Sequence, residues 1–275
     1  MPVSFPESIS IMGIGINPFK SYSQATSCVA AVIAEGGRSF CAAVNPEKVY
    51  RAINDRALAE ALSRADLRIC DGIGVAWAAR ILTGRRIRRC TGVDLFLALA
   101  EKGASLGWKV FLLGAGPESN DGACRVLRAR YPGLVIVGQR HGFFENDGEI
   151  IDQINASGAD LLFVAMGSPR QEFWIAKNRS RLNVPFCMGV GGTWFDGFGI
   201  WRSRPWRGCT FPRNDYLRFI SAERTAAGWW KGIRCTRYIR MRGLRWRFLP
   251  CGKRGARITR TRWIAVFDGW WRRRN

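Results

Sequence analysis

Short apolar runs alternate with segments of helical period along residues 1–192. The runs have the length of strands, and in the segments between them apolar residues recur every three or four positions, as on one face of a helix. The pattern predicts strands at Ser8–Ile16, Arg38–Val44, Leu67–Cys70, Lys109–Leu113, Leu134–Val137, Asp160–Ala165 and Val184–Met188. It predicts helices at Tyr22–Glu35, Glu47–Ser63, Ile73–Leu82, Thr91–Ser105, Ser119–Tyr131, Asp147–Ala156 and Pro169–Arg179.

The order of these elements predicts the fold class. Strands that are apolar on both faces and that alternate with helices form a largely parallel sheet with helices packed on both sides. We therefore expect an α/β, doubly wound, Rossmann-like fold over residues 1–192.

Charge divides the 275 residues into two parts. Residues 1–192 carry 22 basic and 17 acidic side chains, whereas residues 193–275 carry 21 basic and 4 acidic ones. Nine of the twelve Trp also lie in the second part. We expect an α/β region at 1–192 and a basic, Trp- and Arg-rich C-terminal appendage at 193–275.

Several classes of protein are disfavoured. No stretch reaches the roughly 18–20 apolar residues of a membrane-spanning helix, and the first basic residue is Lys20, so the start lacks the charged region of a secretory signal. The nine Cys are scattered without a C-x-x-C pair, which favours buried free thiols over disulfides or a zinc site. His141 is the only His, so a two-His metal site is impossible. We expect a cytoplasmic protein without a metal site.

Polar loops that follow strands form the candidate site, because ligands of parallel α/β sheets bind beyond the carboxyl ends of the strands. These loops contain Asn45, Asp71, Gly114-Ala115-Gly116, and Gln171 with Glu172. We expect their polar groups to converge at one edge of the sheet.

Asp71 offers two interpretations. It follows a buried strand and precedes Gly72-Ile73-Gly74, where a carboxylate can act as a general base toward a hydroxyl. An Asp before a helix is also a common N-cap residue.

A basic run and a capping motif follow. Arg89 ends a run of arginines that either pairs with phosphate or forms a solvated face. Thr91-Gly92-Val93-Asp94 has the pattern of a capping box, which opens a helix.

Gly114-Ala115-Gly116 lies between a strand and a helix. There the backbone can approach a pyrophosphate and direct helix amides at it, or simply form a tight turn. The third glycine of G-x-G-x-x-G is replaced by Ser119, and no acidic residue ends the next strand to hold a nicotinamide ribose. A nucleoside diphosphate therefore fits better than NAD, and an NAD-dependent oxidoreductase is disfavoured.

Three further polar residues are candidates. Gln171 and Glu172 lie in the first turn of a helix that Pro169 announces, where an acidic residue favours the helix dipole. His141 can donate to a sugar or phosphate oxygen, or belong to a turn. No D-x-D motif occurs, so the usual carboxylate clamp for a divalent ion in sugar-nucleotide enzymes is missing.

Taken in order, these segments resemble the bacterial glycosyltransferases of the N-acetylmannosaminyltransferase type, which act in teichoic acid, enterobacterial common antigen and exopolysaccharide biosynthesis. The resemblance covers about 185 residues. The matching segments are Asn45-Pro46-Glu47, Asp71-Gly72-Ile73-Gly74, Arg89-x-Thr91-Gly92-x-Asp94-Leu95, Phe111 to Gly114 with Gly116-Pro117, His141-Gly142-Phe143-Phe144, Gly167-x-Pro169-Arg170-Gln171-Glu172 and Gly189-Val190-Gly191-Gly192.

The resemblance implies an inverting, metal-independent transfer of a sugar from a UDP-sugar to a polyprenyl-diphosphate-linked acceptor, without a cofactor. It implies that the residue matching Asp71 is the base. Substrate-binding roles follow for Asn45, Arg89, Thr91, Gly92, Asp94, Gly114, Gly116, His141, Gln171 and Glu172. N-acetylmannosamine, its uronic acid and glucose all remain open as the donor sugar. The family usually has a hydroxyl side chain two residues before Asn45, where this chain has Ala43.

The C-terminal part matches the family only in patches. Arginines interleaved with Trp suit an anionic membrane surface, which predicts peripheral binding at the inner face of the plasma membrane. The same composition suits nucleic acid, so a nucleic-acid-binding protein on an inert α/β scaffold is the alternative function, with nucleic acid the less favoured partner. A shifted reading frame is a third explanation for residues 225–275.

Overall fold

A computed structural model describes residues 5–191, 240–241 and 244–245 of the chain. The chain divides into two units, Met1–Glu223 and Arg224–Asn275. In the second unit the described residues form a short antiparallel pair, β9 (Arg240–Met241) with β10 (Leu244–Arg245). The rest of the predicted appendage lies outside the described residues, and its boundary at residue 193 stays a prediction.

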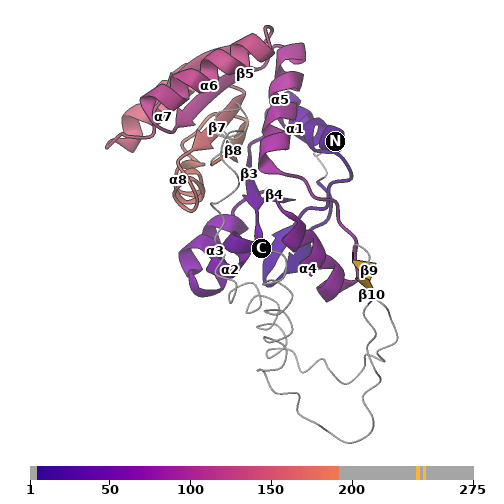
Figure 1. Cartoon of the computed structure of the whole chain (residues 1–275). Coiled ribbons are helices and arrows are strands. Elements are labelled where there is room, and N and C mark those ends of the chain that lie inside the picture. The colour runs from indigo at the N-terminus through magenta and orange to yellow at the C-terminus, as the bar shows by residue number, and fades with distance from the viewer. Residues whose placement is uncertain (1–4, 192–239, 242–243, 246–275) are drawn as a thin grey trace, which may run out of the picture. The chain divides into compact units, whose positions relative to one another are not determined.

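A six-stranded parallel sheet forms the centre of the first unit (Figure 1). Its strand order is β4-β3-β8-β7-β5-β6, and every neighbouring pair runs parallel. The predicted α/β fold class is therefore confirmed. The strands are β3 (Ser39–Val44), β4 (Leu67–Cys70), β5 (Lys109–Gly114), β6 (Val135–Arg140), β7 (Leu161–Ala165) and β8 (Phe186–Gly189).

Helices cover both faces of this sheet. One core cluster joins the sheet to α1, α5 and α6, and the other joins it to α2, α3, α4, α7 and α8. The helices are α1 (Tyr22–Ala34), α2 (Pro46–Asn54), α3 (Arg56–Ser63), α4 (Ile73–Thr83), α5 (Gly92–Leu106), α6 (Pro117–Arg130), α7 (Asp147–Ala156) and α8 (Arg170–Asn178).

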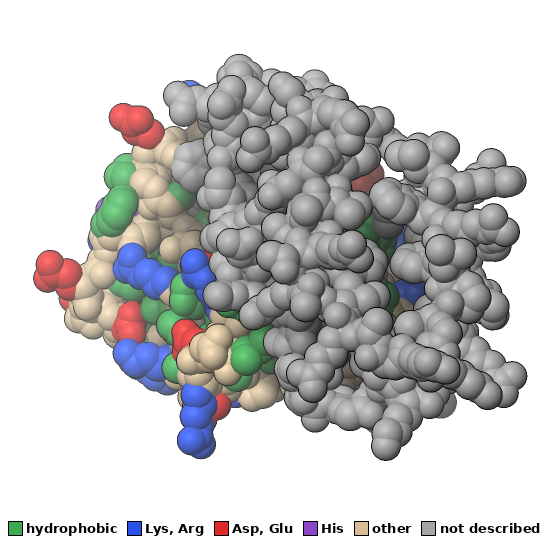
Figure 2. Space-filling view, turned by 60° about the horizontal axis from the view of Figure 1, so that its bottom comes forward, with side chains coloured by type: hydrophobic (Ala, Val, Ile, Leu, Met, Phe, Trp, Pro, Cys, Tyr) green, Lys and Arg blue, Asp and Glu red, His purple; other side chains and the backbone are tan. Residues whose placement is uncertain are grey.

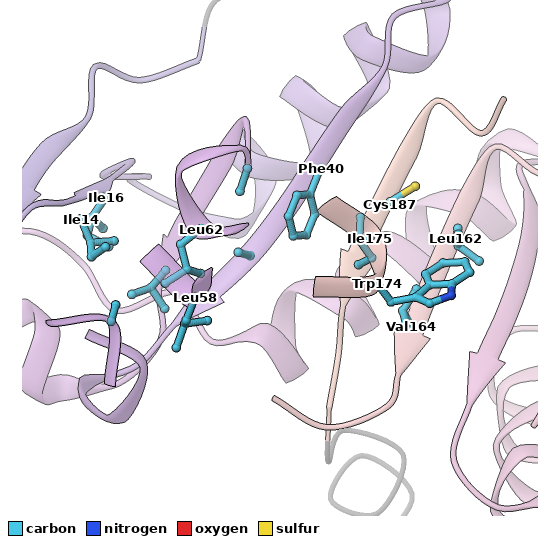
Figure 3. Packing of buried hydrophobic residues seen from close by; sticks show 14 of the residues in the cluster. Ile14, Ile16, Phe40, Leu58, Leu62, Leu162, Val164, Trp174, Ile175 and Cys187 are labelled. Carbon is cyan, nitrogen blue, oxygen red and sulfur yellow. The ribbon is translucent and has the colours of Figure 1, made fainter. Parts of the chain in front are cut away.

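The interior strand β3 shows how one strand contributes side chains to both core clusters. All six of its residues are buried, and successive side chains point to opposite faces of the sheet. Phe40 belongs to one cluster and Cys41 to the other. Figure 3 shows Leu62 of α3 and Ile175 of α8 on either side of Phe40. A strand buried on both faces must be apolar throughout, as the sequence pattern indicated.

The first predicted strand is wrong in its extent. Residues 8–16 form a hairpin of β1 (Ile9–Ile11) and β2 (Ile14–Ile16), which pairs with itself and not with the six-stranded sheet. Met12 and Gly13 have φ of 51° and 83°, the positive values that a two-residue hairpin turn requires. The alternating isoleucines of both strands still face the core.

The second predicted helix is also wrong, because it is two helices. Asp55 leaves the helical conformation at φ −119° and ψ 93°, and its carboxylate accepts a hydrogen bond from the Leu58 amide at 3.0 Å. Asp55 is thus the N-cap that starts α3 directly after α2 ends. The other elements lie where the pattern predicts them, with ends shifted by three residues or fewer.

One face of the described part has a mixed surface. The face drawn in Figure 2 carries basic, acidic and hydrophobic side chains close to one another over its described area. None of the helices in the described ranges has the length and apolarity to cross a membrane. The six Cys in these ranges are free, and all but Cys28 are buried, as the scattered spacing predicted.

Candidate active site

Loops that follow two pairs of neighbouring strands, β4 with β3 and β7 with β5, lie at the carboxyl edge of the sheet. A Cβ placed on Gly72 after β4 would lie 3.4 Å from Pro46 after β3, so these two loops touch. The Ala115 amide after β5 donates to the carbonyl of Ala165 at the end of β7 over 2.7 Å. The predicted grouping of loops at one edge follows from the parallel sheet.

Asp71 is a half-buried base candidate and not a helix cap. The N-cap of α4 is Gly72, which makes no side-chain capping bond, and the Asp71 amide is held by the Val44 carbonyl at 2.9 Å. The Asp71 carboxylate instead accepts a hydrogen bond from the Gly92 amide at the start of α5. The alternative interpretation as an N-cap is therefore wrong.

Burial raises the pKa of Asp71 above its ordinary value, because the low-dielectric surroundings disfavour the charged form. The positive charges of Lys48 and Arg89 and the Gly92 amide oppose this rise, while Asp94 adds to it. A carboxylate with a raised pKa accepts a proton more readily than a solvated one, which suits a general base.

Thr91 and Asp94 form half of the predicted capping box. The Thr91 hydroxyl accepts from the Asp94 amide at 3.2 Å and donates to the Asp94 carboxylate at 2.6 Å. The Thr91 amide, however, donates to the hydroxyl of Tyr22, which itself donates to Asp94 at 2.9 Å. Tyr22 thus takes the place that the carboxylate has in a complete capping box. Arg89 lies just before this motif and is exposed. Its positive charge acts to lower the pKa of Asp71.

Lys48 is a buried cation that the sequence pattern does not reveal. Asn45 caps α2 by accepting from the Lys48 amide at 2.8 Å, and this turn directs the Lys48 side chain inward. Its ammonium donates to the Ala43 carbonyl and to Glu172, both at 2.7 Å. A buried charge of this kind persists only when it is paired.

Glu172 and Gln171 complete this buried network. The Glu172 side chain is fully buried, and Gln171 donates to the same Glu172 oxygen as Lys48, at 3.0 Å. The side-chain oxygen Oε1 of Gln171 accepts a hydrogen bond from the Gly191 amide at 2.9 Å. A Cβ on Gly189 would lie 2.7 Å from the Gln171 amide nitrogen, so a side chain there would push Gln171 out of this network. Glu172 lies in the first turn of α8 as predicted, but its partner is Lys48 and it is not a solvated capping residue.

The turn after β5 is rich in glycine and lies at the same edge of the sheet. Gly114 has φ 119°, and a Cβ there would collide with the Ala165 carbonyl, so the close approach of β5 and β7 requires glycine. Gly116 is the N-cap of α6 and makes no side-chain capping bond, so the first-turn amides of α6 keep their capacity for an anionic ligand. Asn120 donates to the Gly114 carbonyl at 2.9 Å and holds the turn in place.

His141 lies in a turn beside this glycine-rich loop. Its Nδ1 accepts from the Phe143 amide at 3.3 Å, and the next residue, Gly142, donates its amide to Ala115 at 2.8 Å. Arg170 donates to the Gly142 carbonyl at 3.3 Å. The turn therefore connects the loop after β5 to the start of α8, which carries Gln171.

Within residues 5–191 and the β9–β10 pair, no group of three His, Cys, Asp or Glu side chains is placed to hold a metal ion. The cations that face Asp71 in this part of the chain are Lys48 and Arg89.

Comparison with known proteins identifies the family. The model of the glycosyl transferase WecG/TagA/CpsF family matches residues 9–196. The chain belongs to this family. The resemblance found in the motifs is thereby confirmed, and the matched range contains all of the candidate site residues.

Two curated proteins similar to this chain are named N-acetylglucosaminyldiphosphoundecaprenol N-acetyl-beta-D-mannosaminyltransferase. The one from Bacillus spizizenii is 33% identical over 160 residues, which are 58% of this chain and 62% of that protein. The one from Bacillus subtilis is 32% identical over 155 residues, which are 56% of this chain and 60% of that protein. The chain thus matches less than two thirds of each relative's length.

A solved structure that overlaps the chain adds nothing to the family assignment. An arylmalonate decarboxylase mutant in its sulfate-associated form overlaps 76% of this chain and 79% of its own, at 16% identity and a TM-score of 0.26. A TM-score of this size carries no argument about fold or function.

Ala43, where the resemblance predicts a hydroxyl side chain, lies beside the base candidate. A Cβ placed on Gly92 would be 3.1 Å from the Ala43 side chain and 3.9 Å from an Asp71 carboxylate oxygen. Ala43 therefore lies against the residue whose amide binds Asp71. A hydroxyl at position 43 would lie in this same polar neighbourhood.

Proposed function

We propose that the chain is an inverting glycosyltransferase that moves N-acetylmannosamine from a UDP-sugar to a polyprenyl-diphosphate-linked N-acetylglucosamine. The family supports the reaction class, and the names of the two Bacillus relatives support the sugar and the acceptor. The observation that carries the proposal is the Asp71 carboxylate, which lies half-buried at the carboxyl edge of the sheet, where it faces Lys48, Arg89 and the Gly92 amide.

Asp71 is the base of the proposed reaction. Its carboxylate removes the proton from the acceptor hydroxyl as the oxygen attacks the anomeric carbon of the donor. A bond forms between the acceptor oxygen and that carbon, while the bond from the carbon to the UDP oxygen breaks. The proton stays on Asp71 and UDP leaves with the electron pair. A single displacement of this kind inverts the anomeric centre and needs only one carboxylate.

The leaving diphosphate needs positive charge in the transition state. Arg89 is exposed next to Asp71, and the uncapped first turn of α6 after Gly116 offers amides to an anion. We assign the diphosphate to these groups. Gln171, held at the same edge by Gly191, is assigned to the sugar together with Asn45.

Thr91, Gly92 and Asp94 have a different part in this proposal. The Gly92 amide binds the base, and Thr91 and Asp94 fix the start of α5 that presents this amide. Glu172 acts through Lys48, and His141 borders the glycine-rich loop at Gly114. The uronic acid of N-acetylmannosamine and glucose are the other donor sugars to test, and the inner face of the plasma membrane is the proposed location.

The test uses the full chain with a short-chain lipid-diphosphate N-acetylglucosamine acceptor and a panel of UDP-sugars. Mass spectrometry of the product and UDP release are measured. The proposal expects an added mass of one N-acetylhexosamine with UDP-N-acetylmannosamine and at least tenfold slower turnover with UDP-glucose. Absence of transfer from every donor, together with binding of nucleic acid that weakens steeply with salt, would instead support the nucleic-acid-binding alternative.

A further inference from the structure

The exposed face of α4 is apolar. Ile73, Trp77 and Ile81 are 55%, 44% and 65% exposed, and their spacing of four residues places them on one side of the helix. Arg80 is the one charged residue of α4 and is exposed beside them. A surface helix ordinarily turns polar residues to solvent. This face of α4 instead exposes large apolar side chains to solvent.

Arginines lie on α4 and in the loop that follows it. The segment 72–93 contains five Arg and no acidic residue. In the loop that follows α4, Arg85, Arg86 and Arg88 are exposed. Together with Ile73, Trp77, Arg80 and Ile81 they form what we name the α4 surface, a row of large apolar side chains bordered by positive charge.

The chain segment that carries the α4 surface begins and ends next to the candidate site. α4 begins directly after Asp71-Gly72, and the arginine loop returns to the same strand end, where the Cys90 amide donates to the Cys70 carbonyl at 2.8 Å. β4 is the edge strand of the sheet, and Figure 1 shows α4 at the margin of the described fold. A partner on this surface would therefore lie next to Asp71.

We infer that the α4 surface docks on an anionic lipid bilayer. Apolar side chains enter the interface while the surrounding arginines bind lipid phosphates, as in interfacial amphipathic helices. Charge argues against two other occupants. Residues 193–275 carry 21 basic and 4 acidic side chains, and a second copy of the surface carries the same four arginines, so either would be repelled. A nucleic acid would leave both isoleucines without an apolar partner.

Docking in this orientation would bring the site to a lipid-linked acceptor, and only this consequence depends on the proposed function. The diphosphate of such an acceptor lies at the level of the lipid headgroups. The arginine loop, including the site residue Arg89, follows α4 directly and is exposed, so it would meet these headgroups when α4 is docked.

The test measures binding of the full chain to vesicles of phosphatidylcholine with 30% phosphatidylglycerol. The variant Ile73→Ser/Trp77→Ser/Ile81→Ser removes the apolar row. The matched control Ile53→Ser/Leu106→Ser/Val135→Ser removes three side chains of similar exposure at scattered positions. We expect about a tenfold or greater loss of the partition coefficient for the first variant and less than about a twofold change for the second, because only the first set lies on one face.

Hydrogen–deuterium exchange gives the location directly. Vesicles should slow exchange in peptides covering residues 73–89, and pure phosphatidylcholine should not. Binding of the first variant within twofold of the parent, or unchanged exchange in these peptides, would overturn the inference. Turnover of a short-chain acceptor without vesicles separates the two proposals, because the first variant should keep it. An inactive parent that still docks through residues 73–89 would contradict only the proposed function.

Discussion

Replacing Lys48 by Met tests whether the buried ion pair stabilises the site. The Lys48 ammonium lies 2.7 Å from Glu172, and the two side chains are 7% and 0% exposed. Removing the cation leaves a buried carboxylate whose second oxygen has no hydrogen-bond partner within the described residues. Breaking such a pair from one side costs about 3–5 kcal/mol. We expect Lys48→Met to lower the free energy of unfolding by about this amount.

The double variant Lys48→Met/Glu172→Gln separates the charge from the packing. It removes both charges and keeps an amide that can pair with Gln171. We expect it to be more stable than Lys48→Met alone by about 1–3 kcal/mol, since the uncompensated carboxylate is gone.

Urea unfolding followed by circular dichroism measures both effects through the midpoint and the slope. Arg56→Met is the matched control. Arg56 pairs with Glu60 at 3.3 Å, but the side chains are 93% and 58% exposed. This pair should contribute less than about 1 kcal/mol. A loss below about 1 kcal/mol for Lys48→Met, or additive losses in the double variant, would refute the assigned role of the pair.

Three further predictions concern the loops and the base. Gly114→Ala should destabilise the fold by more than about 2 kcal/mol, measured by thermal unfolding, because its Cβ collides with the Ala165 carbonyl at φ 119°; an unchanged midpoint would contradict this. Asn120→Ala should cost about 1–3 kcal/mol in urea unfolding, because buried carbonyls lose their donor; a neutral variant would contradict this. The raised pKa of Asp71 predicts that turnover falls with decreasing pH at a midpoint above the ordinary 3.8, and Lys48→Met should move this midpoint higher; a midpoint at or below 3.8 would contradict it.

Much of the fold is predictable because its physical cause is local. The strands of a parallel sheet covered on both faces must be apolar throughout, and helices between them must repeat at 3.6 residues. The two errors have local causes as well. Met12-Gly13 is not among the common hairpin dipeptides, and Asp55 breaks one helical pattern by a cap that does not interrupt the apolar period.

The candidate site is predictable only in part. Asp71 and Gly114 could be found because strand ends in a parallel sheet share an edge. Lys48 could not, because a lysine on a helix is ordinarily exposed, and its partner Glu172 is 124 residues away. Tyr22 likewise reaches Asp94 across 72 residues. Partners so distant in the chain leave no periodic signal in a single sequence.

The Ala43 departure shows what the structure adds to a motif. The motif alone marks a missing hydroxyl near Asn45. The structure places this position against Gly92, whose amide binds Asp71. Ala43→Thr is therefore a variant whose effect would be read in the pKa of Asp71 and in turnover.

The most direct test of the account is the turnover of Asp71→Asn with UDP-N-acetylmannosamine and a short-chain lipid-diphosphate acceptor. Asparagine keeps an oxygen for the Gly92 amide but cannot take a proton. The exposed Asp152→Asn serves as the control. We predict a fall in kcat of at least about 100-fold for Asp71→Asn with the donor KM nearly unchanged, and no change for the control. Retention of more than about a tenth of the parent kcat would contradict the assignment of Asp71 as the base.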